Sequence, residues 1–158
     1  GDLKDNGLTH AVAIMGERWA FLILRASFNG VKHFEDYAQQ LGIARNILSN
    51  RLNKFVAEQI MRRDPCPHDR RKVEYHLTDK GLDLLPAMIS LRQWGEKYGL
   101  GVPSSPVLVD ARDTQPIGSM EIRSHDGRRL TWHDLLWKDG EETCESEPYC
   151  DREERAVG

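Results

Sequence analysis

The sequence predicts an α+β fold of short helices followed by a β-hairpin and a long helix, and three observations support this prediction. Val73, Tyr75 and Leu77 alternate with polar residues, which is the two-residue period of a half-buried strand. Thr78 follows at once, and its hydroxyl suits a helix N-cap. Before the strand, two helical patterns meet at Gly42, a residue type that ends a helix without steric cost. Together these features predict a winged helix-turn-helix domain.

The first helices are predicted from the spacing of apolar residues. Leu8, Val12 and Met15 recur at helical intervals, and a second apolar run covers residues 19–28. Residues 31–34 then form a short connector with room for a small strand.

Residues 34–41 and 43–58 predict the helix-turn-helix pair, because each segment has an apolar stripe at helical spacing. The polar side of the second helix carries hydrogen-bond donors and no carboxylate, whereas a solvated helix face usually mixes glutamate with lysine. A helix that enters a major groove must avoid carboxylates and present donors to phosphates and base edges. Pairs of helices joined by glycine also occur in ordinary bundles, which is the alternative. The polar residues are Arg45, Asn46, Ser49, Asn50, Asn53 and Lys54.

The hairpin has a basic tip. Residues 60–63 lead through a proline-containing loop to three consecutive cations, Arg70, Arg71 and Lys72. Such a wing suits the DNA backbone or the minor groove, where negative potential favours Arg and Lys. An ordinary surface hairpin is the alternative.

Charge is unevenly distributed along the chain. The net charge is −3, yet residues 44–72 hold eight basic and three acidic residues, a net of +5. After Leu100 there are seven basic and thirteen acidic residues, a net of −6 that arises mostly from residue 139 onward. The basic segment is the footprint expected of a phosphate binder, or else a solvated surface, and the acidic tail is expected to point away from DNA.

Composition argues against several other classes of protein. There is no apolar run near the roughly 18 residues that cross a bilayer and no N-terminal leader, so a cytoplasmic protein is expected. Cys66, Cys144 and Cys150 lack paired spacing, which argues against a disulfide framework and a zinc site. No cofactor is expected. Two His-Asp pairs, at 125–126 and 133–134, have no accompanying nucleophile or phosphate loop, so no enzyme activity is expected.

The helix after Thr78 is predicted to be long and to have two apolar faces. Leu82, Leu85 and Ile89 fall on one side of a helical wheel. A second face needs a partner subunit, the first helix or the C-terminal tail to bury it. A two-fold dimer would place two recognition helices about 34 Å apart, one turn of DNA. A bend is expected at Pro86, which has no amide to donate. The residues of the second face are Leu84, Met88, Leu91, Trp94 and Tyr98.

The C-terminal part is predicted to hold a small β-rich appendage beside this helix. Residues 107–110 and 119–123 suggest a hairpin, Asp126-Gly127 the next turn, and residues 129–132 a third strand. The domain prediction is residues 1–99 for DNA binding and dimerisation, 100–138 for the appendage and 139–158 for an acidic, disordered tail.

Four motifs in the right order make residues 6–99 resemble the HxlR-type transcriptional regulators, relatives of the MarR group. The resemblance implies a homodimeric winged helix-turn-helix that binds a near-palindromic operator as a repressor or an activator. Three positions depart from the family pattern: Asn6 replaces a common sensing cysteine, His33 a common arginine, and Arg70-Arg71 common prolines. The motifs are GERW at 16–19, LSNRL at 48–52, VEYHLTDKG at 73–81 and WG at 94–95.

The expected function is therefore that of a homodimeric, sequence-specific DNA-binding regulator, a repressor released by a small effector. An aromatic effector would sit near the dimer seam at Met15, Trp19, Leu91 and Trp94, although core packing is the stronger interpretation of these residues because the same positions must close the fold. The open alternatives are a thiol-responsive regulator acting through Cys66 and a winged-helix module that binds protein and not DNA. The base-facing candidates are Arg45, Asn46, Ser49, Asn50 and Asn53, the phosphate candidates Lys32, His33, Arg51 and Lys54, and the wing candidates Arg70, Arg71 and Lys72.

Overall fold

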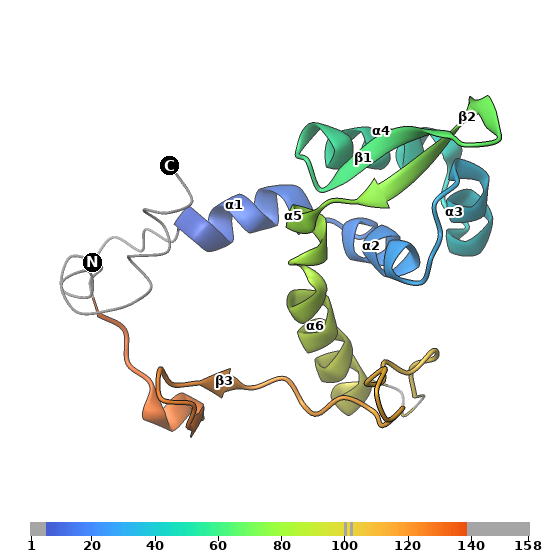
Figure 1. Ribbon diagram of the computed structural model, residues 1–158. Coiled ribbons are helices and arrows are strands. Elements are labelled where there is room, and N and C mark those ends of the chain that lie inside the picture. The colour runs from blue at the N-terminus through green and yellow to red at the C-terminus, as the bar shows by residue number, and fades with distance from the viewer. Residues whose placement is uncertain (1–5, 100, 102, 139–158) are drawn as a thin grey trace. The chain divides into compact units, whose positions relative to one another are not determined.

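The computed structural model describes residues 6–99, 101 and 103–138 and confirms an α+β winged-helix fold (Figure 1). The chain divides between Gly118 and Ser119 into two units that pack separately. The first unit contains α1 (Asn6–Met15), α2 (Ala20–Phe28), α3 (Phe34–Leu41), α4 (Arg45–Ala57), β1 (Met61–Cys66), β2 (Asp69–Leu77), α5 (Asp79–Leu82) and α6 (Leu85–Tyr98). The second contains β3 (Ile122–Arg123), β4 (Arg129–Leu130) and the 3-10 helix η1 (Trp132–Asp134).

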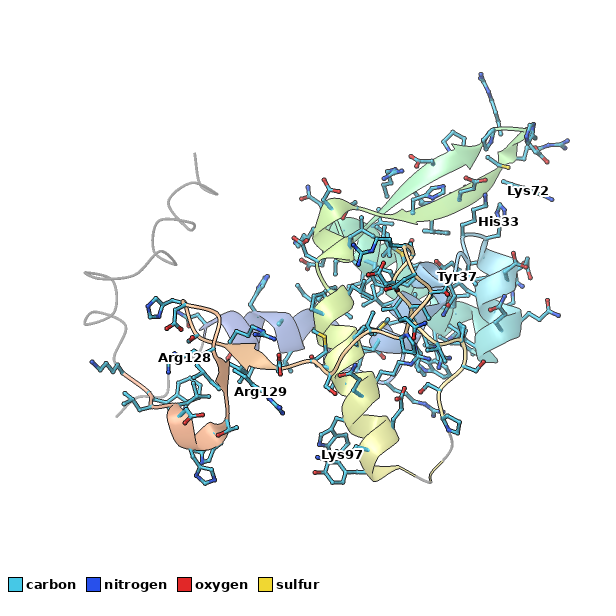
Figure 2. All side chains as sticks on the ribbon, turned by 60° about the horizontal axis from the view of Figure 1, so that its bottom comes forward. His33, Tyr37, Lys72, Lys97, Arg128 and Arg129 are labelled. Carbon is cyan, nitrogen blue, oxygen red and sulfur yellow. The ribbon has the colours of Figure 1, made fainter. Side chains whose placement is uncertain are left out.

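The core of the first unit lies between α2, α3, α4 and the hairpin, which Figure 1 shows gathered together while α1 extends to one side. Tyr37 is its largest fully buried side chain. Its hydroxyl donates to the carbonyl of Val31 at 2.9 Å and lies 2.6 Å from Ser27 Oγ (Figure 2). Burial raises the pKa of Tyr37 to about 12, so the phenol stays neutral and fixes α3 against α2.

The turn between α3 and α4 is the one predicted. Gly42 ends α3 with a φ of 61°, a left-handed conformation that is strained for other residues. Only two residues separate Gly42 from Arg45, where α4 begins, so the second helix crosses close to the first.

The hairpin is an antiparallel pair in which Met61 faces Leu77 and Arg63 faces Tyr75, with an irregularity between Pro65 and Cys66. The connector before α3 contributes a single β-bridge between His33 and Glu74. The hairpin is therefore attached at its middle to the residues that open the helix-turn-helix.

The strand-to-helix junction is confirmed in detail. Thr78 Oγ1 accepts from the amide of Gly81 at 3.2 Å, and the same hydroxyl donates to the carbonyl of Ile60 at 3.1 Å. A Cβ on Gly81 would lie 2.3 Å from the carbonyl oxygen of Ile60, so only glycine allows α5 to pack this closely on the turn before β1.

The single long helix predicted after Thr78 is wrong. Four residues of α5 are separated by Asp83 and Leu84 from α6, which has 14 residues. Pro86 stands in the first turn of α6, where its missing amide costs nothing. The proline thus starts a new helix where a bend inside a continuous one was expected.

The first C-terminal hairpin was also predicted with the wrong partner. Val109 forms a bridge with Pro116, so residues 107–110 return within a few positions. The Asp110 carboxylate accepts from the amide of Arg112 at 2.8 Å, which tightens this turn. The segment packs on α6, where Arg92 donates to the carbonyl of Pro106 and Gln93 Nε2 donates to that of Gly118 at 3.1 Å.

In the second unit, the Asp126-Gly127 turn is confirmed and joins β3 to β4. Asp126 accepts from Arg128 Nε at 3.0 Å and Asp134 from the amide of Thr131 at 2.8 Å, so both His-Asp pairs use their carboxylates in local turns (Arg128 in Figure 2). Hydrogen bonds from the Ser124 hydroxyl and then from Arg128 lower the pKa of Asp126, and hydrogen bonds from the amide and hydroxyl of Thr131 lower the pKa of Asp134. The described residues contain no group of metal ligands and no helix of a length and hydropathy that would span a bilayer. The predicted acidic tail, 139–158, lies outside them.

Candidate nucleic-acid interface

A groove of about 870 Å³ lies between α3, the first turns of α4 and the hairpin. It brings together residues predicted separately from the recognition helix, the connector and the wing: His33, Arg45, Ser49, Asn53, Arg71 and Lys72. Figure 2 shows His33 and Lys72 near one another where the hairpin meets the start of α3. Phe34, Glu35, Asp36, Arg63, Cys66, Val73 and Tyr75 complete its lining.

Four of the base-facing candidates project from α4 without partners. Asn46, Ser49, Asn50 and Asn53 are all exposed, and none makes a side-chain hydrogen bond within the described part of the chain. The opposite side of α4 is held in the core by Leu48, Leu52 and Phe55. The helix therefore presents a row of uncommitted amide and hydroxyl groups to solvent.

The fifth base-facing candidate, Arg45, is held by α3. Its two terminal nitrogens donate to the two oxygens of Glu35, Nη1 to Oε2 at 2.8 Å and Nη2 to Oε1 at 2.7 Å. Its Cζ also lies 5.0 Å from the centroid of the Phe34 ring. The hydrogen bond and charge of Arg45 lower the pKa of Glu35, so the carboxyl is ionised at neutral pH.

Two of the phosphate candidates contact α1 and the turn after it. Arg51 Nε lies 3.0 Å from Glu17 Oε2, and Lys54 Nζ donates to the carbonyl of Ala13 at 2.8 Å. The Nε–H of Arg51 does not point at Glu17 Oε2, so this contact is an ion pair and not a hydrogen bond. Arg51 Nε and the other carboxylate oxygen, Glu17 Oε1, are buried and have no hydrogen-bond partner in the described structure. In this conformation both cations serve the protein's own packing.

The wing cations face solvent. Arg70, Arg71 and Lys72 are exposed, and the Arg71 side chain is 94% exposed with only Asp69 Oδ1 near it, at 3.6 Å. The Asp69 carboxylate also accepts from the backbone amide of Arg71 at 3.0 Å, which shapes the start of β2. The three cations are thus free to approach an external polyanion.

Glu74 is a buried carboxylate on β2, at the position where the hairpin bridges to His33. His76 Nε2 lies 2.8 Å from its Oε2, and Lys32 Nζ lies 3.6 Å from its Oε1. The hydrogen bond to His76 and then the Lys32 charge hold the pKa of Glu74 below its usual value against the opposing effect of desolvation. Lys32, predicted to contact phosphate, is therefore partly neutralised in the free protein.

The four effector candidates differ in exposure. Met15 is buried in the core and Trp19 packs partly against it, whereas Leu91 and Trp94 are exposed on α6. Leu91 lines a pocket of about 340 Å³ together with Phe21, Met88 and the segment 104–106.

Sequence reasoning missed the acidic partners of these cations. Glu17, Glu35 and Glu74 lie far from Arg51, Arg45 and Lys32 in the chain or on other elements, so no spacing rule pairs them. The excess of basic over acidic residues in 44–72 indicated a phosphate-binding or solvated surface, and it gave no sign of which acidic residue each cation would meet.

Comparison with known proteins places this geometry in a family. A family model described as HxlR-like helix-turn-helix matches residues 14–101. The uncharacterised HTH-type transcriptional regulator Rv3095 of Mycobacterium tuberculosis is 44% identical over 96 residues, which are 61% of this chain and 60% of that protein's length. The matched part thus spans under two thirds of this relative.

Two solved structures are similar in fold. PA1607, which is assigned as a transcription factor, superposes with a TM-score of 0.78 at 32% identity, over 86% of this chain and 96% of its own. The redox regulator HypR in its reduced form gives a TM-score of 0.53 at 26% identity, over 57% of this chain and 90% of its own. These names describe regulators and no enzyme.

Proposed function

Because the chain belongs to the HxlR-like helix-turn-helix family, we propose that it is a homodimeric transcriptional regulator that binds DNA in a sequence-specific way. One observation supports DNA binding above all others. Ser49 and Asn53, which are uncommitted side chains of α4, line one groove together with Arg71 and Lys72 of the wing. Donors for bases and donors for phosphates therefore meet in the same groove.

The proposed contacts follow from this placement. Asn46, Ser49, Asn50, Asn53 and Arg45 would meet base edges, and Arg70, Arg71 and Lys72 the backbone beside them. Lys32 and His33 would reach phosphate next to α3. Arg51 and Lys54 would do so only by leaving Glu17 and Ala13, and we assign them first to holding α4 in place.

The direct test is selection of bound duplexes from a random DNA library, followed by sequencing. The proposal expects a near-palindromic consensus with half-sites one helical turn apart. If nothing is enriched, and the chain also fails to retain DNA from its own upstream region, the protein is a winged-helix module for protein binding instead.

The dimer is supported by apolar side chains left at the surface. Leu91, Trp94 and Tyr98 are 53%, 66% and 65% exposed along one side of α6, and Leu8 and Val12 are more than half exposed on α1. Trp94 and Tyr98 pack on one another with ring centroids 5.7 Å apart. Such a stripe is more exposed than an isolated domain usually tolerates, and a second copy would cover it.

Repression with release by a small effector is the proposed form of regulation, with the protein in the cytoplasm beside its DNA. The pocket beside Leu91 offers an effector both apolar walls and the Arg25 and Arg92 side chains. A reporter gene placed behind the chain's own upstream region tests the sign of regulation.

A thiol response is a second candidate, favoured by the likeness to HypR. Cys66 is half-buried and lines the groove, so a modified thiol would stand between the wing and α4. In oxidant-treated protein, loss of DNA binding that Cys66→Ser prevents would support this function, and an unchanged loss in that variant would exclude it.

A further inference from the structure

Glu35 places a carboxylate on the face that we propose meets DNA, where a negative charge is unexpected. Glu35 and Arg45 both line the groove, and their side chains are 71% and 66% exposed. A carboxylate beside phosphates repels them, and an exposed ion pair adds little stability. The pair therefore costs binding energy without a matching gain in folding.

The geometry of the pair holds the guanidinium in one position. Glu35 takes one N–H from each terminal nitrogen of Arg45, and the Phe34 ring supports the guanidinium at 5.0 Å. Phe34 itself packs against the core, and Glu35 stands on the first turn of α3, which the tight turn at Gly42 joins to α4. A side chain held in this way loses little further freedom on binding.

The contact leaves donors free on Arg45. A guanidinium carries one N–H on Nε and two on each terminal nitrogen. Glu35 accepts one N–H from each terminal nitrogen, so the Nε–H and the other N–H of each terminal nitrogen are not used by Glu35. The Nε and neighbouring Nη groups form a fork that matches the two acceptors of guanine, O6 and N7. Arg45 is the first residue of α4, the end of a recognition helix that lies nearest the bases.

We propose that Arg45 reads a guanine in each half-site and that Glu35 is the positioning residue that aims it, with Phe34 as the supporting surface. This inference rests on the proposed DNA-binding function. Glu35 thereby gives sequence choice at the expense of general affinity, since its charge weakens attraction to any phosphate nearby.

The experiment is parallel selection from one random duplex library with four full-length proteins: wild type, Glu35→Gln, Arg45→Lys and Asp36→Asn. Asp36 is the matched control, because it is an exposed carboxylate on the same turn and in the same groove and has no ion pair with Arg45. Affinity for an unselected duplex is measured for each protein alongside the selections.

The expected result separates the two carboxylates. In the wild type and Asp36→Asn, one position in each half-site prefers guanine by about 5- to 150-fold, the range of one bidentate contact. In Glu35→Gln and Arg45→Lys this preference falls to within about 3-fold of the other bases, while their affinity for unselected DNA is equal to that of wild type or higher. Circular dichroism confirms that all four proteins are folded.

Other outcomes overturn the inference. If Glu35→Gln keeps the guanine preference and only binds all DNA more tightly, Glu35 merely masks Arg45. If Arg45→Lys keeps every preference of the wild type, the guanidinium fork of Arg45 is not what selects guanine, since lysine lacks that fork. If the wild type itself selects no sequence, the proposed function fails and the inference with it, and this outcome is distinct from the other two.

Discussion

Arg51 on the recognition helix lies 3.0 Å from the carboxylate of Glu17, in the turn between α1 and α2. Both side chains are about two thirds buried, and Glu17 Oε2 also accepts from the backbone amide of Trp19 at 3.0 Å. Less than one turn further along α4, Lys54 reaches the carbonyl of Ala13. The helix proposed to read DNA is therefore tied to α1, whose exposed residues we assign to the dimer.

Replacing Arg51 by Met is expected to lower the free energy of unfolding by roughly 1 to 2 kcal/mol, because Glu17 is left half-buried without its cation. This loss is smaller than that expected for a fully buried ion pair, since solvent still reaches Arg51 and Glu17. Urea denaturation measures the change, and Asn50→Ala, an exposed change on the same helix, should stay within about 0.5 kcal/mol. A variant of wild-type stability whose DNA binding loses salt dependence would instead assign Arg51 to phosphate.

Asn50→Ala tests the base-facing side of α4. Asn50 is exposed and makes no side-chain hydrogen bond in the described structure, so its removal should spare the fold. Binding to the selected operator should weaken by about 1 to 3 kcal/mol, while binding to random DNA stays the same. Fluorescence anisotropy on both duplexes gives the two values, and an equal loss on each would refute the base-reading role.

Arg71→Ala tests the wing. Because Arg71 is 94% exposed and has only a distant carboxylate near it, its charge is available to phosphate. All sequences should be weakened similarly, and the slope of log affinity against log salt should fall by about 1. Arg128→Ala, a cation of the second unit paired with Asp126, is the control and should leave that slope as in the wild type.

Trp94→Ala tests the dimer. Truncating a 66% exposed tryptophan that the fold does not need should shift the protein toward monomers at micromolar concentration, since aromatic anchors dominate such interfaces. Sedimentation velocity measures the shift. Trp132→Ala removes an equally exposed tryptophan, 70%, from the second unit and should leave the dimer intact. The assignment of the α6 stripe to the dimer fails if the two variants behave alike.

Glu74 predicts a specific loss of stability in acid. Its pKa is lowered from 4.5 in the folded protein, so its contribution is fully present above pH 4.5 and is lost as pH falls through the folded value. Glu74→Gln should therefore be less stable than the wild type at pH 7, and the difference should close as the pH falls below 4.5 and through the lowered pKa of Glu74. Urea midpoints across this range measure it, with Glu58→Gln as the control. A difference that is constant with pH would mean that packing, and not ionisation, sets the role of Glu74.

The sequence predicted correctly those features that depend on residues close together in the chain. The apolar spacing of residues 34–41, the cap at Thr78 and the turn at Gly42 all act within a few residues, and the structure has each of them. The predictions that failed required a choice between partners. Residues 107–110 had several possible partners, and the tight turn at Asp110 made Pro116 the nearest. The break at Asp83 and Leu84 separates α5 from α6, and a helical wheel cannot show it because a wheel assumes one continuous helix.

The sequence by itself determined the winged helix-turn-helix, the donor-rich face of α4 and the basic wing, because periodicity and residue chemistry are properties of neighbouring positions. Only the tertiary structure decided which of those cations are free. Arg71 stands in solvent, whereas Arg45, Arg51 and Lys32 meet Glu35, Glu17 and Glu74 across elements. An ion pair forms over a few ångströms of space whatever the distance along the chain, and the fold alone brings those charges together.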